Sequence, residues 1–116
     1  MLKQKRLEVS EVGDVTVVHF RDQRIIEDLA IQETGQELIE LVGEGRTKLL
    51  LNFSAVGFMS SAALGKLITL NKKVQAAGGA LKMCNIRPEI REVFVITRLD
   101  RLFDIKEDES EALAAF

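Results

Sequence analysis

Segments with strand spacing alternate with segments of helical spacing along this sequence, and that alternation limits the folds open to the chain. Residues 48–53 have the sequence KLLLNF, a nearly continuous apolar run typical of a central strand that is covered on at least one face. From residue 60 to residue 77, apolar side chains form one broad helical stripe, which Gly78 and Gly79 close. The sequence therefore predicts a buried strand followed by a long helix.

The amino-terminal part of the chain repeats this alternation. Two Val-rich segments, RLEVSEV and DVTVVHF, meet at Gly13-Asp14 and predict a β-hairpin. Helical spacing from Ile31 to Val42 predicts a first helix, with Asp28 as its expected cap and Gly43 as its stop.

The carboxyl-terminal part continues the pattern. ALKMCN predicts another strand, and Pro88 is expected to start a short helix whose inward side chains are Ile90, Val93 and Phe94. LFDI then predicts a last edge strand. The segment DESEALAAF predicts a closing helix, with Asp108 and Glu111 as a capping box.

Strands that alternate with helices imply right-handed crossover units and parallel pairing. The chain has 116 residues, the size of one ordinary domain, and it shows no internal repeat or linker. The predicted fold class is therefore α/β: a single-domain sandwich over residues 1–116. It has a mixed sheet of four or five strands and about four helices packed mainly on one face.

Composition argues against several classes of function. The formal net charge is -2 and the chain has no Trp or Tyr, so nucleic acid is not an expected partner. No apolar run approaches the roughly 20 residues of a membrane span, and the start lacks a secretory signal. The single cysteine, Cys84, has no partner for a disulfide or metal pair. A cytoplasmic protein without membrane contact, metal or cofactor is expected.

The segment between the central strand and the long helix is the candidate functional loop. Loops at the carboxyl ends of strands carry the binding sites of open α/β sheets. The loop from Ser54 to Met59 lies at such an end, and the adjacent serines Ser60 and Ser61 follow it. Spacing favours Ser60 as the helix N-cap, a role that explains only one of the two hydroxyls. Phe58 and Met59 are more typical of core residues than of a recognition feature.

Catalysis by these serines is not expected. A serine nucleophile needs a nearby base, and the only histidine, His19, belongs to a predicted strand. The segment FMSSAALGK has no glycine-rich arc that could wrap a phosphate chain before Lys66. The central strand ends in Asn52 instead of the aspartate that a phospho-accepting receiver domain needs.

What remains is a helix amino terminus that carries an accessible hydroxyl. Phosphorylation of Ser61 would add about -1.5 to -2 charges where free backbone N–H groups and the helix dipole tolerate negative charge. The fold would stay intact, while a partner docked over the same helix end would meet a new charge. The pattern thus favours a binding switch.

The sequence resembles a known family at this loop. LLLNFSAVGFMSSAALGKLITLNKKVQAAGGALKMCNI is similar to the core of a STAS domain, the fold of bacterial anti-sigma factor antagonists. The usual loop of that family is D-x-S-x-V-x-F-[ML]-D-S-S-G-L-G. REVFVITRLDRLFDIKEDESEAL resembles the family's third helix, last strand and terminal helix, so the resemblance spans most of the chain.

The resemblance implies a non-enzymatic regulator of transcription. In the family, an anti-sigma factor that is also a serine-protein kinase binds the domain and phosphorylates the first serine of the D-S-S-G loop. That position is Ser61 here. A phosphatase, expected to be of the PP2C type, reverses the modification, and only the unmodified form captures the anti-sigma factor. The residues expected to shape or line the partner-binding surface are Asn52, Ser54, Phe58, Met59, Ser60 and Gly65.

Departures from the family loop leave alternatives open. Ser60 and Asn52 replace two aspartates, and Ala62 and Ala63 replace a serine and a glycine. The loss of two carboxylates equally fits a scaffold module that binds a partner without phosphorylation. A small-ligand or nucleotide site at the strand ends and a homodimer through an edge strand or the carboxyl terminus also stay open. Gly65 is explained equally well by internal packing or by partner contact.

Overall fold

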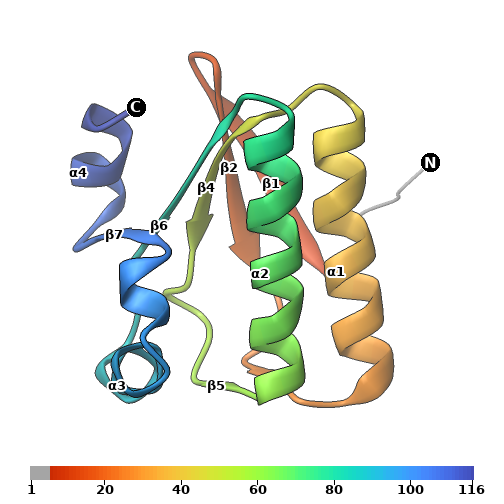
Figure 1. Ribbon diagram of the computed structural model, residues 1–116, viewed down its shortest axis with the longest axis vertical. Helices are drawn as coiled ribbons and strands as arrows, with labels where there is room; N and C mark the ends of the chain where they lie inside the picture. Colours follow the sequence, from red (N-terminus) through yellow and green to blue (C-terminus); the bar gives the residue numbers. More distant parts are fainter. Residues whose placement is uncertain (1–5) are drawn as a thin grey trace.

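A computed structural model describes residues 6–116 and shows an α/β sandwich (Figure 1). The elements in chain order are β1 (Leu7–Val12), β2 (Val15–Phe20), β3 (Arg24–Ile25), α1 (Asp28–Gly43), β4 (Lys48–Asn52), β5 (Phe58–Met59), α2 (Ser61–Ala76), β6 (Ala80–Cys84), α3 (Pro88–Ile96), the 3-10 helix η1 (Leu99–Arg101), β7 (Asp104–Lys106) and α4 (Glu109–Ala114). The order and the mixed sheet confirm the predicted fold class.

The main sheet has five strands in the order β1-β2-β4-β6-β7. Only β1 is antiparallel to its neighbour, and the β1–β2 hairpin turns at Gly13, whose φ of +62° glycine adopts without a steric penalty. Leu49, Leu50 and Leu51 of β4 are all 0% exposed. Because successive strand residues point to opposite faces, this burial shows that both faces of the sheet are covered.

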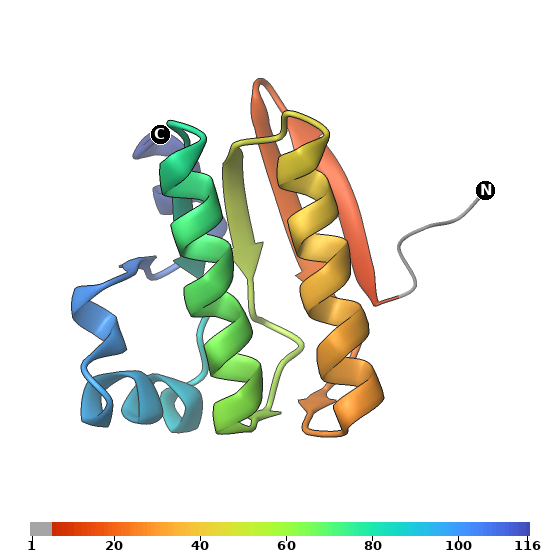
Figure 2. The ribbon, with the colours of Figure 1, turned by 45° about the vertical axis from the view of Figure 1, so that its right-hand side comes forward.

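The helices cover the two faces unequally. α1 and α2 run side by side across one face, where they enclose the larger core together with α3 (Figures 1 and 2). The short α4 lies on the opposite face, where its Ala112 packs in a smaller cluster with Val17, Leu50 and Cys84. Most of the helical mass is on one face, as predicted.

Two local predictions are wrong. Asp28 is the first residue of α1, and the cap position belongs to Glu27, which makes no side-chain cap hydrogen bond. An aspartate is favourable both at the N-cap and in the first turn, where it interacts with the helix dipole. The sequence therefore does not show which of these two positions Asp28 occupies. Val93 is 38% exposed, whereas Ile90 and Phe94 are 4% and 0% exposed. α3 buries a narrower stripe than its apolar content suggests.

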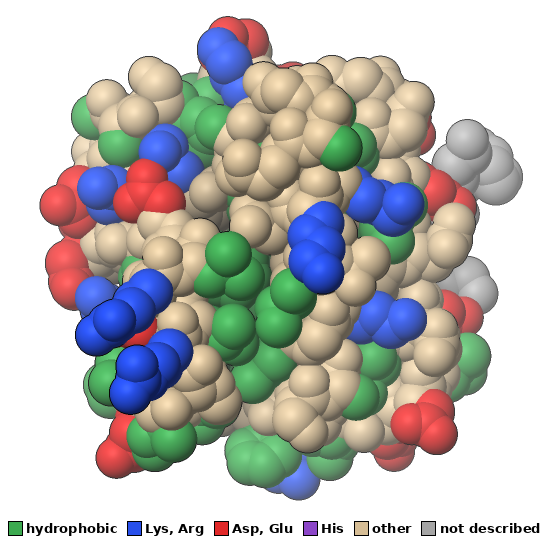
Figure 3. Space-filling model, in the orientation of Figure 1, with side chains coloured by type: hydrophobic (Ala, Val, Ile, Leu, Met, Phe, Trp, Pro, Cys, Tyr) green, Lys and Arg blue, Asp and Glu red, His purple; other side chains and the backbone are tan. Residues whose placement is uncertain are grey.

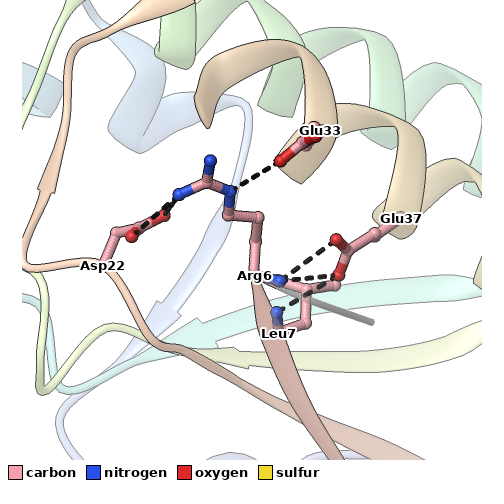
Figure 4. A network of polar contacts seen from close by, with 5 residues as sticks. All are labelled: Arg6, Leu7, Asp22, Glu33 and Glu37. Carbon is pink, nitrogen blue, oxygen red and sulfur yellow. Dashed lines mark hydrogen bonds and ion pairs between the residues drawn. The ribbon is translucent and has the colours of Figure 1, made fainter. Parts of the chain in front are cut away.

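A buried carboxylate joins the start of β1 to α1 (Figure 4). Glu37, which is 5% exposed, accepts hydrogen bonds from the backbone N–H groups of Arg6 at 3.1 Å and of Leu7 at 3.2 Å. The Arg6 side chain also pairs with Asp22 at 3.3 Å and with Glu33 at 2.9 Å. Glu37 therefore satisfies backbone donors that lie at the edge of the sheet beside a helix.

Replacement of Glu37 by alanine is expected to lower the free energy of unfolding by about 2 kcal/mol, because buried N–H groups lose their acceptor. Urea denaturation monitored by circular dichroism measures the change. Glu33→Ala is the matched control, since it removes a more exposed carboxylate one turn away and is expected to cost less than about 1 kcal/mol. Equal losses in the two variants would contradict the role given to Glu37.

Candidate functional site

The loop after β4 is held from inside by Asn52. Its Oδ1 accepts a hydrogen bond from the Ser54 backbone N–H at 2.9 Å, and the residue is only 6% exposed. Ser54 itself is exposed. Asn52 thus shapes the loop from beneath, whereas Ser54 lies on the surface.

Arg87 holds the same loop from the side, a role that the sequence did not predict. Its Nε and Nη2 groups donate to the Ser54 carbonyl oxygen at 3.2 and 3.1 Å. Arg87 occupies the N-cap position of α3 directly before Pro88, so α3 and the loop are joined at one point. The only sequence signal was a charged residue next to the predicted start of a helix.

The end of the loop forms a small parallel sheet that was not predicted. Phe58 and Met59 of β5 pair with Arg24 and Ile25 of β3, and the Ser60 N–H donates to the Ile25 carbonyl at 3.1 Å. Two-residue strands are too short for a periodic signal, which is why sequence spacing did not indicate them. The pairing fixes the position at which α2 begins.

The two residues of β5 differ in exposure. Phe58 is 51% exposed, and the Arg24 guanidinium lies 5.4 Å from its ring centroid. Met59 is partly buried and packs against the main core. Met59 therefore supports the loop from below, while Phe58 presents an aromatic ring to solvent.

The two serines have different environments. The Ser60 side chain accepts a hydrogen bond from the Ala63 N–H at 3.2 Å and caps α2, as predicted. Ser61 is the first residue of α2 and is exposed. No hydrogen bond within residues 6–116 engages the Ser61 hydroxyl. The second hydroxyl is thus available at a helix amino terminus.

Gly65 lies on the exposed side of α2, one turn after Ser61. A Cβ added at Gly65 would meet no atom within 4 Å among the described residues. Packing within this part of the chain therefore does not require glycine at this position, and the internal explanation for Gly65 is wrong.

A groove of about 340 Å³ lies beside β5. Its lining residues are Gln23, Arg24, Ala55, Gly57, Phe58, Arg87 and Glu89. Two arginines and a half-exposed phenylalanine are the lining residues best suited to contact a ligand. This combination is more typical of a surface that binds a protein segment than of a site for a small polar molecule.

A polar cluster lies behind the loop, at the carboxyl ends of β2, β4 and β6. The Asn52 Nδ2 donates to Glu109 Oε1 at 2.9 Å and to Asn85 Oδ1 at 3.3 Å. His19 Nε2 lies 3.4 Å from the same Glu109 oxygen. The only histidine of the chain is therefore engaged with α4, across the sheet from α2, and is not placed to activate Ser61.

Asn52→Asp is expected to destabilise the fold by about 2 kcal/mol at about pH 8, because it sets a second carboxylate against Glu109. Repulsion raises the folded-state pKa of the introduced carboxyl above its unfolded value. The loss is therefore small at about pH 4 and grows as pH rises through the folded-state pKa. Urea denaturation at both pH values measures it.

Glu109→Gln in the Asn52→Asp background is the control for this prediction. Removal of the second carboxylate is expected to recover most of the lost stability at the higher pH. A loss that is the same at both pH values, or that persists with Glu109→Gln, would contradict electrostatic repulsion as its cause.

Cys84 is buried beside this cluster and is 0% exposed. Burial raises the pKa of its thiol to about 12, with further contributions from Glu109 and Asp108. A thiol in this state is a poor nucleophile.

Within residues 6–116 no three His, Cys, Asp or Glu side chains are grouped to hold a metal. None of the helices in this range has the length and apolar character to cross a bilayer.

The fold and the site together define a small α/β domain that presents a hydroxyl at a helix amino terminus and holds its one histidine against α4. Comparison with known families gives the same class. The family model for the STAS domain matches residues 6–112, so the chain belongs to the STAS domain family.

Curated relatives resemble the chain over most of its length. BtrV of Bordetella bronchiseptica, named as a candidate anti-sigma factor antagonist, is 27% identical over 94 residues, which cover 81% of each chain. The TM1081 homolog of Thermotoga neapolitana, named in the same way, is 30% identical over 103 residues, covering 78% of this chain and 91% of its own.

Solved structures share the fold. TM1081 of Thermotoga maritima has a TM-score of 0.85 and 20% identity, with 96% of this chain and 94% of its own covered. The Bacillus protein SpoIIAA in its phosphorylated form has a TM-score of 0.71 and 20% identity, with coverage of 94% and 97%. Its unphosphorylated form also has a TM-score of 0.71, with 17% identity and 94% of both chains covered.

Proposed function

We propose that this STAS-domain protein is an anti-sigma factor antagonist switched by phosphorylation. Its partner is an anti-sigma factor that is also a serine-protein kinase, and Ser61 is the phosphoacceptor. One observation carries the proposal: Ser61 is exposed at the first residue of α2 and nothing within residues 6–116 engages its hydroxyl, while the adjacent Ser60 hydroxyl is used as the cap. The names of the curated relatives support the antagonist function.

Phosphorylation at this position suits a switch that leaves the fold intact. The 16 residues of α2 give a helix dipole whose positive end lies at Ser61, where an anion is stabilised. A partner seated over the same helix end would have to desolvate the phosphate or pair with it. SpoIIAA is known in an unphosphorylated and a phosphorylated form, which supports the same reasoning here.

The partner-binding surface in this proposal runs from the loop to the first turns of α2. Ser54, Phe58 and Gly65 are exposed along it. The open space at Gly65 favours close approach by a partner backbone, because a Cβ there would meet no atom of residues 6–116 within 4 Å. Asn52, Met59 and Ser60 act from beneath, through the loop hydrogen bond, the core contact and the helix cap.

Phosphate mapping tests the acceptor. The protein is incubated with ATP and an anti-sigma factor that has serine-kinase activity, and mass spectrometry locates the label. We expect one phosphate, on Ser61, which Ser61→Ala abolishes and Ser60→Ala does not. Removal of the label by a PP2C-type phosphatase would complete the cycle in the cytoplasm. Label on another residue, or none, would overturn the role of Ser61.

A scaffold module without covalent control is the second candidate. It is favoured by Asn52, which replaces the family's aspartate and pairs with Glu109 in a fully formed hydrogen-bond cluster. In that case the same surface binds a partner constitutively. Binding by Ser61 variants separates the two candidates, as argued in the Discussion.

A further inference from the structure

The backbone of Ser54 is linked on both sides to the carboxyl-terminal part of the chain. Its carbonyl oxygen accepts hydrogen bonds from Arg87 at 3.1 and 3.2 Å. Its N–H donates to Asn52 Oδ1 at 2.9 Å, and Asn52 in turn donates from Nδ2 to Glu109 Oε1 at 2.9 Å. The loop from Ser54 to Met59 therefore depends on α3 through a direct contact and on α4 through a relay of two hydrogen bonds.

Only one orientation of the Asn52 side-chain amide satisfies this relay. A backbone N–H can only donate a hydrogen bond, and an ionised carboxylate can only accept one, so Oδ1 must face Ser54 while Nδ2 faces Glu109. Asn85 Oδ1 lies 3.3 Å from Asn52 Nδ2. Because the Asn85 side chain is itself an amide, it can offer either a donor or an acceptor. Asn85 thus fits both orientations of Asn52 and does not select between them.

Burial makes the orientation of Asn52 matter. Asn52 is only 6% exposed, so water has little access to an amide that is wrongly turned. Such an amide would set Nδ2 against the Ser54 N–H and Oδ1 against the Glu109 carboxylate, and a buried polar group that loses its partner bears the full cost of its desolvation. Glu109 and the Ser54 N–H are therefore the two groups that select the orientation. Without Glu109, only the Ser54 N–H does so.

α4 places Glu109 on the face of the sheet opposite α2. Ala112, one turn further along α4, is buried in the smaller cluster on that face. His19 and Asn52 are register partners on β2 and β4, and the Glu109 oxygen that accepts from Asn52 also lies 3.4 Å from His19 Nε2. Figure 3 shows no histidine side chain on the face that α1 and α2 present, in agreement with the position of His19 beside α4. A carboxylate on one face of the sheet thus acts, through Asn52, on a loop that leads to α2 on the other face.

We propose that Glu109 is a positioning residue for the partner-binding loop: its carboxylate fixes the Asn52 amide, and the amide fixes the Ser54 backbone. The effect on partner binding rests on the function proposed above, whereas the effect on the loop does not. An aspartate at position 52, as in the usual loop of the family, has no side-chain N–H to donate to Glu109 when it is ionised. The relay therefore requires the asparagine of this chain together with a carboxylate on α4.

Hydrogen exchange of the Ser54 amide, followed by NMR on the full chain, tests the proposal. We expect Glu109→Ala to accelerate this exchange about tenfold, because the Asn52 amide then loses its hydrogen bond to a charged acceptor. Glu109→Gln is expected to accelerate it less, since the glutamine side-chain oxygen can still accept from Asn52. The Val56 amide is the internal reference: it belongs to the same loop, donates to the Phe53 carbonyl at 2.9 Å and should keep its exchange rate.

Glu111→Ala is the matched control. Glu111 also belongs to α4, where it accepts a hydrogen bond from the Glu107 N–H at 2.8 Å. Its removal loosens the start of α4 and is expected to leave exchange at Ser54 unchanged. A Ser54 exchange rate that Glu109→Ala does not alter would overturn the proposal. So would equal acceleration at Ser54 and Val56, or equal effects of the two α4 variants, because either would indicate a general loosening of the fold.

Calorimetric titration with an anti-sigma factor that has serine-kinase activity extends the test to partner binding. We expect Glu109→Ala to weaken binding about fivefold, since affinity falls with the fraction of molecules that keep the loop conformation, and Glu111→Ala to leave it unchanged. A normal affinity in Glu109→Ala would overturn the role of Glu109 in partner binding. If the unmodified wild-type protein binds no anti-sigma factor, the proposed function fails instead, and the exchange rates decide whether Glu109 positions the loop.

Discussion

Replacement of Ser61 by aspartate is expected to weaken binding of the anti-sigma factor about 100-fold, or about 2.7 kcal/mol. The carboxylate stands in for the phosphate and brings an unpaired charge into the contact. Its effect on the fold should be slight and favourable, because an acidic residue in the first turn of a helix stabilises it by about 0.3–1 kcal/mol. Calorimetric titration with the purified anti-sigma factor measures the affinity.

Ser61→Ala is the control for this prediction. It removes the hydroxyl without adding charge, and it is expected to retain binding while resisting phosphorylation. Affinities that fall equally in the two variants would indicate that Ser61 is a simple contact residue. Affinities that are unchanged in both would favour the scaffold candidate. A fall with aspartate alone supports the switch.

Replacement of Gly79 by alanine is expected to cost about 3 kcal/mol of unfolding free energy, by overpacking. A Cβ at Gly79 would lie 2.1 Å from the Thr47 carbonyl oxygen and 2.6 Å from the Thr47 Cβ. The same carbonyl accepts the Ala80 N–H at 2.8 Å, so relief of the clash would disturb the pairing of β6 with β4. Urea denaturation measures the loss.

Gly65→Ala is the matched control for Gly79→Ala. Gly65 lies within α2 and has open space around it, so alanine is expected to raise stability there by about 0.5–1 kcal/mol through helix propensity. The same glycine-to-alanine replacement should therefore lower the free energy of unfolding at residue 79 and raise it at residue 65. Destabilisation by Gly65→Ala, or none by Gly79→Ala, would contradict the packing described above.

The long periodic elements were predictable because their signal is spread over many residues. In β4 and in α2, several buried apolar residues contribute to the same periodic pattern, so the pattern is clear in the sequence. The capping signals of Ser60 and Asp108 are likewise local, since each side chain bonds a backbone N–H three residues ahead. The order of elements and the loop residues were enough to suggest the family.

Contacts between distant segments were not predictable. Arg87 bonds the loop at Ser54 across 33 residues, and Glu109 meets Asn52 across 57. The pairing of β3 with β5 also joins segments that carry no periodic pattern of their own. Val93 was assigned to the core because spacing shows which residues are apolar, but not how wide a stripe the domain covers.

The two glycines after α2 show where the division lies. The sequence by itself determined that α2 stops there: Gly78 adopts a φ of +75° and the N–H groups of Gly78 and Gly79 bond back to Gln75 and Val74. Only the tertiary structure decided why Gly79 must lack a side chain, because the Thr47 carbonyl that fills its space comes from a segment more than 30 residues earlier. The stop depends on local backbone hydrogen bonds, which neighbouring residues specify. The space available for a side chain at Gly79 depends on how closely β6 lies to the segment before β4, and that distance is set only once the sheet and helices have packed.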